Sequence, residues 1–571
     1  MTATTNPSPR PLGSGPDDPD GPPHGGWRRL RRRLILPGIA AVALQVLVAA
    51  GDVVPAVDTL VYLESGRNLF EGNGFTRFGG PELHFPPLVP TALGFLLEVF
   101  GTPLAAVKVW EVLTGLALVA AVTALARRLW DDDDVTVTAA WIGGALSGLG
   151  PMLVRRGSGS EGITAALLIA ALVLVLGPPS SAGGGRRGLG PLVGAGALAG
   201  LAYLARPEAL LPALVMGAAL LVDGFRRRER GLDPSAAMAF GLGLALLVAP
   251  YLVYLHSNTG SWSPTSKSQD VSVEAWRAVA EDDREWRDQI LYAIDESGTD
   301  FANDTTSLTS LARQHPRAWL GIFKVNVLEM ADIYLVPGSD RRVAQVPLPL
   351  LLAAAAAAIK ARRRSAVWLT LTIGALPVAT CLFFFTQPRY VVMTTVVIAA
   401  FSAGGIVSWY RRLPARWPWA LAVAVVLWTG VSYVAESWPM LPGITRRESD
   451  DHAYVGQWLR ENTDPDDRIM TRSFHVQYYG RRPVVALPAA GYDAMMTFAR
   501  ARGVHYIVAD ERTIRTRRAQ LYEPLFLEPT PPGLREVAVI GRGSRMVRIF
   551  ELDPLPPPSE LPPLPLGFVG D

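Results

Sequence analysis

The chain has 571 residues, of which 49% are hydrophobic and only 18% are charged, and its mean hydropathy is +0.23. This composition is too apolar for an ordinary soluble enzyme. The 54 basic and 51 acidic residues nearly balance, which argues against a nucleic-acid partner. A single cysteine, Cys381, excludes an internal disulfide and a cysteine-rich metal site.

Apolar stretches that approach the ~20 residues needed to cross a bilayer recur along the chain. They lie at 34–53, 105–129, 135–154, 162–177, 189–205, 208–223, 235–255, 346–359, 366–385, 391–409 and 417–435. We therefore predict a polytopic α-helical membrane protein with about eleven spans.

Arginine and lysine clusters set the expected orientation, because short cytoplasmic loops retain positive charge. Such clusters lie at 28–33, 127–128, 186–187, 226–230, 360–364 and 411–416. All of them are cytoplasmic if the N-terminus is inside and the C-terminus outside. This holds only if 88–100 does not cross the membrane, so we expect an interfacial or re-entrant helix there. A cleaved signal peptide at 28–50 is the alternative, and we favour a signal anchor because many spans follow.

This threading leaves outer segments at 54–104, 256–345 and 436–571. Residues 1–26 are rich in Pro and Gly, and 553–571 are rich in Pro, so both are expected to be disordered or polyproline-like. Between 436 and 552 we predict a small extracytoplasmic α/β domain. Its helices are expected at 454–461 and 492–502, and its strands at 468–471, 483–487 and 504–509.

Ionisable residues near membrane depth are costly, which makes each one a functional candidate. On a helix in the first outer segment, Asp58, Tyr62 and Leu69 share one face. Asp58 could face a cavity or cap the helix, and its position alone leaves both open. The run 131–134 resembles a metal-binding acidic motif, but its cytoplasmic position favours a solvated loop.

Several motifs carry a resemblance to a known family. They are Asp58 four residues before Tyr62, EGNGF at 71–75, HFPPLVP at 84–90, SGSEGITAALL at 158–168, GLAYLARPEALL at 200–211, TGSW at 259–262 with Lys267, and QPRYVV at 387–392. In these motifs the chain resembles the GT-C superfamily of polytopic glycosyltransferases. The likeness is greatest to the protein O-mannosyltransferase and lipid A aminoarabinose transferase group. It covers roughly residues 34–435 and is weaker in the C-terminal domain.

The chain departs from the family pattern at two places. The family often has a second acid after the first, where this chain has Thr59, which argues against a two-carboxylate metal site in this loop. Some members have a Lys before the Pro-Pro element, where this chain has His84 and Phe85. The second departure leaves open which cation meets the donor phosphate.

The resemblance implies transfer of a sugar, with inversion, from a polyprenyl-phosphate donor to a hydroxyl of a glycan, lipid or protein on the outer face. Asp58 is then the general base. Arg206, Lys267 and Arg389 are the cations for the leaving phosphate. The remaining substrate-binding candidates are Tyr62, His84, Glu161 and Tyr390. No cofactor is certain, and the requirement for a divalent cation is left open.

Each of these residues also has a structural interpretation. Arg206 and Arg389 could anchor helix ends at the lipid headgroups, and Tyr390 could belong to an aromatic belt. Glu161 could pair with Arg155 or Arg156, and His84 could be an interfacial residue without a role.

Other functions also remain open. The alternative is a transporter or flippase of lipid-linked sugars, although the sequence has no internal repeat. A scaffold in envelope biogenesis is a third option. The Arg-rich, Lys-poor composition is typical of a high-GC bacterium, which suggests a plasma membrane and a decaprenyl or undecaprenyl carrier.

Overall fold

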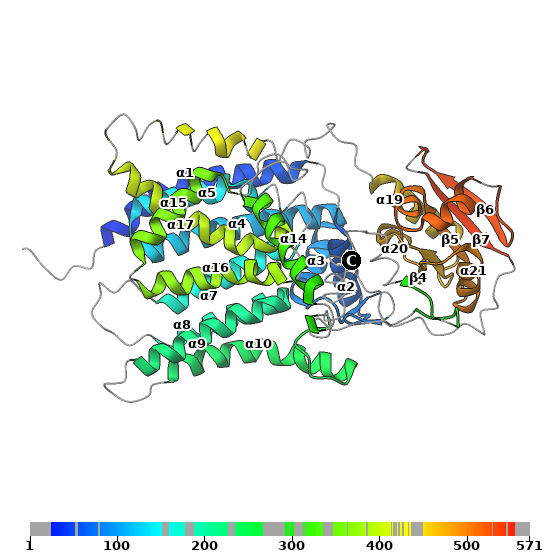
Figure 1. Cartoon of the computed structure of the whole chain (residues 1–571), viewed down its shortest axis with the longest axis horizontal. Coiled ribbons are helices and arrows are strands. Elements are labelled where there is room, and N and C mark those ends of the chain that lie inside the picture. Colours follow the sequence, from blue (N-terminus) through cyan, green and yellow to red (C-terminus); the bar gives the residue numbers. More distant parts are fainter. Residues whose placement is uncertain are drawn as a thin grey trace, which may run out of the picture.

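The computed structural model describes most residues of the chain. They are 24–51, 55–77, 80–150, 153, 159–177, 188–226, 234–266, 292–295, 297–301, 312–313, 316–334, 346–362, 364–383, 386–412, 414, 420, 423–424, 427–431, 433–434, 449–527, 529–543 and 546–553. A bundle of long helices occupies one side of the molecule and a small sheet with flanking helices the other (Figure 1). Of the terminal segments 1–26 and 553–571, which the sequence predicted to be disordered or polyproline-like, residues 1–23 and 554–571 lie outside the described residues. Residues 24–26 instead begin a helix.

The membrane part consists of helices, and most of the long ones run roughly along a common direction (Figure 1). In chain order they are α1 (His24–Ala50), α2 (Val57–Phe70), α3 (Leu88–Phe100), α4 (Pro103–Trp130), α5 (Asp133–Ala145), η1 (Ser147–Leu149), α7 (Glu161–Leu176), α8 (Leu189–Ala205), η2 (Pro207–Ala209), α9 (Leu210–Arg226), α10 (Ser235–Thr259), α14 (Pro316–Tyr334), α15 (Leu348–Ala361), α16 (Ser365–Phe383), η4 (Pro388–Val391) and α17 (Val392–Tyr410). A short hairpin of β1 (Thr76–Arg77) and β2 (Gly80–Pro81) follows α2.

Six of the described helices are long and apolar enough to cross a membrane. Four shorter apolar helices accompany them, among them α3, which lies where the sequence predicted a helix that does not cross. The predicted span 135–154 is wrong as a single helix, because α5 ends at Ala145 and the short turn η1 follows. Glycines at 148 and 150 have low helix propensity, which explains the break. The total of eleven spans stays a prediction.

Helix α14 was not anticipated from the sequence, because Lys324, Glu329 and Asp332 interrupt its apolar pattern. It lies within the predicted outer segment 256–345 and packs along α16, and the Tyr334 hydroxyl at its end lies 3.3 Å from the Thr395 hydroxyl of α17. The Trp319 ring stacks on Phe383 with 5.4 Å between centroids.

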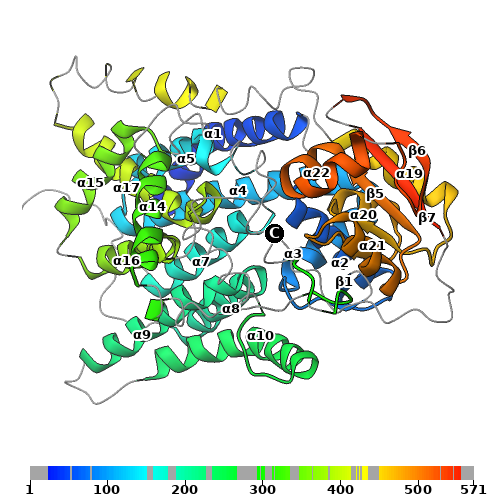
Figure 2. The ribbon, with the colours of Figure 1, turned by 45° about the vertical axis from the view of Figure 1, so that its right-hand side comes forward.

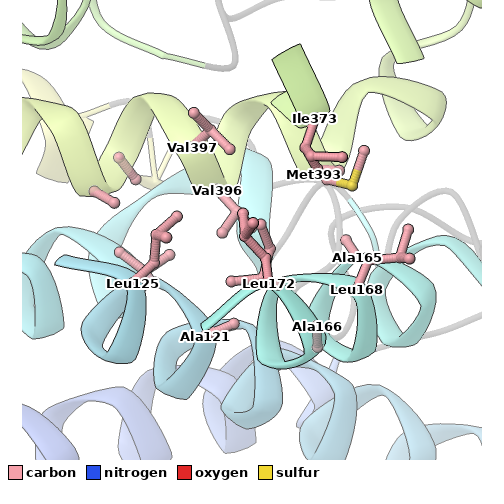
Figure 3. Packing of buried hydrophobic residues seen from close by; sticks show 14 of the residues in the cluster. Ala121, Leu125, Ala165, Ala166, Leu168, Leu172, Ile373, Met393, Val396 and Val397 are labelled. Carbon is pink, nitrogen blue, oxygen red and sulfur yellow. The ribbon is translucent and has the colours of Figure 1, made fainter. Parts of the chain in front are cut away.

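Small residues let neighbouring helices approach closely. A Cβ atom at Gly196 on α8 would lie 1.9 Å from the Phe240 carbonyl oxygen on α10, and one at Gly243 on α10 would lie 2.0 Å from the Val193 carbonyl oxygen. Close backbone approach of this kind is how helices associate where the hydrophobic effect cannot drive them together. The central core unites α4, α7, α16 and α17 (Figure 3).

The two ends of the bundle carry different charge clusters. At one end Arg411, just past α17, forms ion pairs of 2.7 Å with both Asp132 and Asp134, and Arg33 of α1 also pairs with Asp134. Asp132 caps the start of α5. The acidic run 131–134 is therefore a partly exposed set of ion pairs that joins helix ends. Among the described residues no group of His, Cys, Asp and Glu could hold a metal ion.

The C-terminal region contains the predicted elements and further ones. They are α19 (Ser449–Asn462), β3 (Ile469–Thr471), α20 (Phe474–Gly480), β4 (Val484–Ala486), α21 (Tyr492–Ala501), β5 (Tyr506–Asp510), α22 (Glu511–Arg517), η6 (Ala519–Leu521), η7 (Glu523–Leu527), β6 (Leu534–Ile540) and β7 (Val547–Leu552). The strand order is β4-β3-β5-β7-β6, with β3 parallel to β4 and β5, and β7 antiparallel to β5 and β6. The sequence did not predict the β6–β7 hairpin.

Helix α20 joins this domain to the bundle. Phe474 and Tyr478 belong to one buried apolar cluster with Leu60 and Leu63 of α2, and the Arg67 guanidinium lies 5.2 Å from the Tyr478 ring centre. Helices α2 and α3 thus lie between the bundle and the sheet (Figure 2).

Several described contacts attach the second outer segment to the rest of the chain. The Ser266 hydroxyl donates to the Leu83 carbonyl oxygen in the first outer loop. The Tyr292 carbonyl oxygen accepts from the Ala489 amide of the C-terminal domain at 2.8 Å, and the Arg472 and Arg518 guanidiniums lie over the Tyr292 ring.

Candidate active site

Asp58 lies in the first turn of α2, where the helix dipole favours a negative charge. The helix begins after Ala56 without a side-chain cap. The Asp58 carboxylate instead accepts a hydrogen bond of 2.9 Å from the Arg389 guanidinium. The capping interpretation of Asp58 therefore finds no support in the geometry.

A second carboxylate, Glu161, opens α7 at an equivalent helix start. The preceding turn is fixed by a hydrogen bond of 2.6 Å from the Trp110 indole to the Gly159 carbonyl oxygen. Glu161 is only 5% exposed, and burial of a carboxylate requires charged or hydrogen-bonding partners.

Two prolines fix the helix junctions at which the site's arginines lie. Arg206 ends α8 with φ −151° and ψ 129°, and it precedes Pro207. Gln387 is similarly extended, with φ −133° and ψ 147°, and it precedes Pro388. A residue before proline is disfavoured in the helical region, so each helical segment breaks there. Arg206 and Arg389 consequently emerge at helix junctions.

A continuous chain of ion pairs joins Asp58, Arg389, Glu161 and Arg206. Arg389 reaches Asp58 at 2.9 Å through Nη1 and Glu161 at 3.4 Å through Nε. Arg206 reaches the same Glu161 oxygen at 2.5 Å. The side chains of both arginines and Asp58 are about 15% exposed, whereas that of Glu161 is 4% exposed. Glu161 is thus the buried centre that orients both guanidiniums.

Tyrosines complete the cluster on two sides. The Arg206 and Arg389 guanidinium carbons lie 5.1 and 5.2 Å from the Tyr390 ring centre, a cation–π geometry. The Tyr62 hydroxyl donates to Ser160 at 3.1 Å, and Arg206 donates to the same Ser160 oxygen at 3.2 Å. Burial, together with the nearby carboxylates, raises the pKa of Tyr62 well above its usual value. The Tyr62 hydroxyl therefore stays protonated and acts as a donor.

The structure brings together six of the eight residues singled out from the sequence: Asp58, Tyr62, Glu161, Arg206, Arg389 and Tyr390. His84 lies at the border, because its ring packs edge-on against Phe85 at 4.5 Å and Phe85 packs in turn against Tyr62 at 4.6 Å. Lys267 lies outside the described residues, as do Arg155 and Arg156. The described ion-pair partners of Glu161 are Arg206 and Arg389.

The sequence reasoning missed the buried carboxylate that shapes the first outer loop. Glu82 is 0% exposed. It accepts hydrogen bonds from the His84 amide at 2.7 Å and the Phe85 amide at 3.0 Å, and from the Ser65 hydroxyl of α2 at 3.0 Å. Arg77 balances its charge at 3.3 Å. The local sequence around Glu82 does not indicate a buried carboxylate, because its partners come from separate parts of the loop and from α2.

Three further residues of the cluster also escaped notice. Ser160, Gln387 and Glu208 are adjacent to the predicted positions in sequence, and each contacts an arginine of the cluster. Glu208, two residues after Arg206, is half exposed and pairs with it at 3.2 Å. Each of the three lies within two residues of the Glu161, Arg206 or Arg389 that the resemblance singles out.

No family model matches the sequence, and no curated protein matches it. Solved structures do. The archaeal oligosaccharyltransferase AglB from Archaeoglobus fulgidus, in complex with an inhibitory peptide and a dolichol-phosphate, matches with a TM-score of 0.57 at 14% identity, over 86% of this chain and 70% of that one. An oligosaccharyltransferase of the same organism, in the apo form, matches with a TM-score of 0.57 at 15% identity, over 86% of this chain and 71% of that one.

ArnT from Cupriavidus metallidurans, bound to undecaprenyl phosphate, matches over 93% of this chain and 99% of that one. Its TM-score is 0.51 and its identity 15%. At such identities the similarity is one of fold. It covers both the helical bundle and the C-terminal region of the chain.

Proposed function

We propose that this chain, which has the GT-C membrane fold of these structures, is a glycosyltransferase. Its donor is a polyprenyl-phosphate sugar and its acceptor is a hydroxyl of a glycan, lipid or protein. The transfer takes place on the extracytoplasmic face of a bacterial plasma membrane and inverts the anomeric carbon.

The observation that carries the proposal is the meeting of Asp58, Arg206 and Arg389 at one end of the bundle. A carboxylate able to accept a proton lies 2.9 Å from a guanidinium able to bind phosphate, and a second guanidinium shares the same buried Glu161. Glycosyl transfer from a lipid phosphate needs this combination of one base and a cationic site for the leaving group.

The reaction is a single displacement. The acceptor oxygen attacks the anomeric carbon on the face opposite the phosphate, and its proton passes to Asp58. The new carbon–oxygen bond forms as the bond to the phosphate oxygen breaks, and that bond's electron pair stays on the lipid phosphate. Arg206 and Arg389 stabilise the resulting negative charge. One displacement inverts the configuration.

The membrane geometry supports a site at one surface. Arg389 and Arg411 flank α17, and 22 intervening steps at 1.5 Å each separate them by roughly 33 Å, about the hydrocarbon thickness. Arg411 belongs to the basic cluster at the other end. If that cluster is cytoplasmic, as positive residues near spans generally are, the candidate active site is extracytoplasmic.

The polyprenyl class of donor is supported by the bound lipids of two similar structures, a dolichol-phosphate and undecaprenyl phosphate. A divalent cation fits the described residues less well, because Asp58 and Glu161 are both directed at guanidiniums and Thr59 stands where a second acid would be needed. We therefore assign the charge of the leaving phosphate to the arginines.

The test is transfer activity in membranes supplied with a panel of radiolabelled polyprenyl-phosphate sugars. Asp58→Asn keeps the shape of the side chain and removes its basicity, so turnover should fall about 10²-fold or more. Asp493→Asn, an exposed change at the start of α21, is the matched control and should be fully active. Full activity of Asp58→Asn would refute Asp58 as the base. A transporter or flippase would move the labelled lipid without forming any glycosylated product.

A further inference from the structure

The cationic site for the leaving phosphate is already occupied by carboxylates of the chain itself. Arg389 holds Asp58 and Glu161, and Arg206 holds Glu161 and Glu208. Two guanidiniums against Asp58 and Glu161 give a net charge of zero, and Glu208 makes it −1. An incoming lipid phosphate therefore meets no free positive charge among these groups, and it has to displace one of the carboxylates.

The three carboxylates differ in how readily they can leave. Glu161 is buried, touches both arginines and also neighbours the Ser160 hydroxyl at 3.4 Å, so its removal would break the one contact that both guanidiniums share. Glu208 is half exposed and forms an ion pair with Arg206. Asp58 has its described ion pair with Arg389 alone and lies in the first turn of a helix, next to a short extended segment.

The Arg389 contact has a chemical consequence for Asp58. The Oδ2 atom of Asp58 faces Nη1 of Arg389, so a lone pair that would accept the acceptor's proton is directed to a guanidinium. Carboxylate and phosphate oxygens bind guanidinium N–H groups in the same geometry, and both bonds are charge-assisted. A phosphate at Nη1 would therefore release Asp58.

We propose that Asp58 occupies, in the free protein, the place on Arg389 that the donor's phosphate takes during turnover, so that donor binding displaces Asp58 and makes it available to the acceptor. This inference rests on the proposed function and adds an order to it, with donor before acceptor. The ion pair keeps the base inactive until a lipid phosphate is present.

The displacement predicts a change in lipid-phosphate affinity that is not expected if Asp58 acts only as a base. Asn has no charge with which to compete for Arg389, so Asp58→Asn should bind undecaprenyl phosphate more tightly than the wild type, by about three- to tenfold. Asp58→Ser has neither the charge of Asp nor the amide oxygen of Asn, so it should also bind undecaprenyl phosphate more tightly than the wild type does. Asp493→Asn should bind as the wild type does.

The experiment is a titration of the purified full chain in detergent with radiolabelled undecaprenyl phosphate, combined with a double-mutant cycle. Because the competition acts through Arg389, Asp58→Asn should give no tightening in an Arg389→Ala background. Asp58→Ser serves if Asp58→Asn does not fold, and thermal unfolding of each variant checks this.

The outcomes distinguish failure of the displacement from failure of the glycosyltransferase proposal. Tighter binding by the Asp58 variants, lost with Arg389→Ala, supports the displacement. Unchanged or weaker binding by the Asp58 variants, with normal binding by the wild type, overturns the displacement and leaves the glycosyltransferase proposal standing. Absence of binding by the wild type overturns both.

Discussion

Glu161 is the buried centre of the candidate active site, and Glu161→Gln tests whether it holds the two arginines in place. The substitution keeps the size of the side chain and removes its charge. The Glu161 side chain is 4% exposed and one of its oxygens serves Arg206 at 2.5 Å and Arg389 at 3.4 Å. Removal of one partner from a buried pair costs about 3–5 kcal/mol, because it leaves uncompensated charge. In the variant Asp58 still faces Arg389 and the half-exposed Glu208 still faces Arg206. The larger part of the loss should fall on Arg206, because its contact with Glu161 is the shorter one.

The assay is thermal unfolding of the purified chain in detergent. We expect a decrease of about 2–4 °C in the unfolding midpoint of Glu161→Gln, whereas Glu98→Gln, an exposed change on α3, should leave the midpoint unaltered. Undecaprenyl phosphate supplies the missing negative charge, so it should raise the midpoint of Glu161→Gln more than that of the wild type. A variant as stable as the wild type, with an equal response to the lipid, would show that Glu161 does not organise the arginines.

Two further predictions concern the membrane orientation and the domain contact. A periplasmic-type reporter fused after residue 435 should be active and one fused after residue 363 inactive, because the basic clusters require a cytoplasmic N-terminus; the reverse pattern would place the candidate active site in the cytoplasm. Burial and the neighbouring His452 lower the pKa of His475 to about 4, and His475 lies 3.3 Å from the Pro55 carbonyl oxygen just before α2. The unfolded chain binds this proton below about pH 6.5 and the folded chain only below about 4, so stability should be full above 6.5 and fall as the pH decreases toward 4. His475→Gln should lose less thermal stability than the wild type between pH 7 and 5. An identical decrease in both would show that His475 does not cause this pH dependence.

Local sequence patterns were sufficient to locate most of the helices. An apolar stretch of the length of a bilayer predicts a helix wherever it occurs, and α4, α7, α8, α10, α16 and α17 lie within a few residues of the predicted spans. The same patterns failed where charges or glycines interrupt an apolar run, at α14 and after α5. Packing against α16 stabilises α14 there, and a local pattern contains no information about it.

The composition of the candidate active site followed from motifs, but its connections did not. Asp58, Glu161, Arg206 and Arg389 could each be named from the sequence, because a charge beside a span is costly and therefore conspicuous. Their pairing could not, since Arg389 and Asp58 are 331 residues apart and nothing local says which carboxylate meets which guanidinium. Glu82 is the extreme case, because its partners lie on α2, on β1 and in the loop that follows β2. The sequence determines which groups must find partners, and only the packed helices decide which partners they find, because the energy of an ion pair depends on distances that the fold alone sets.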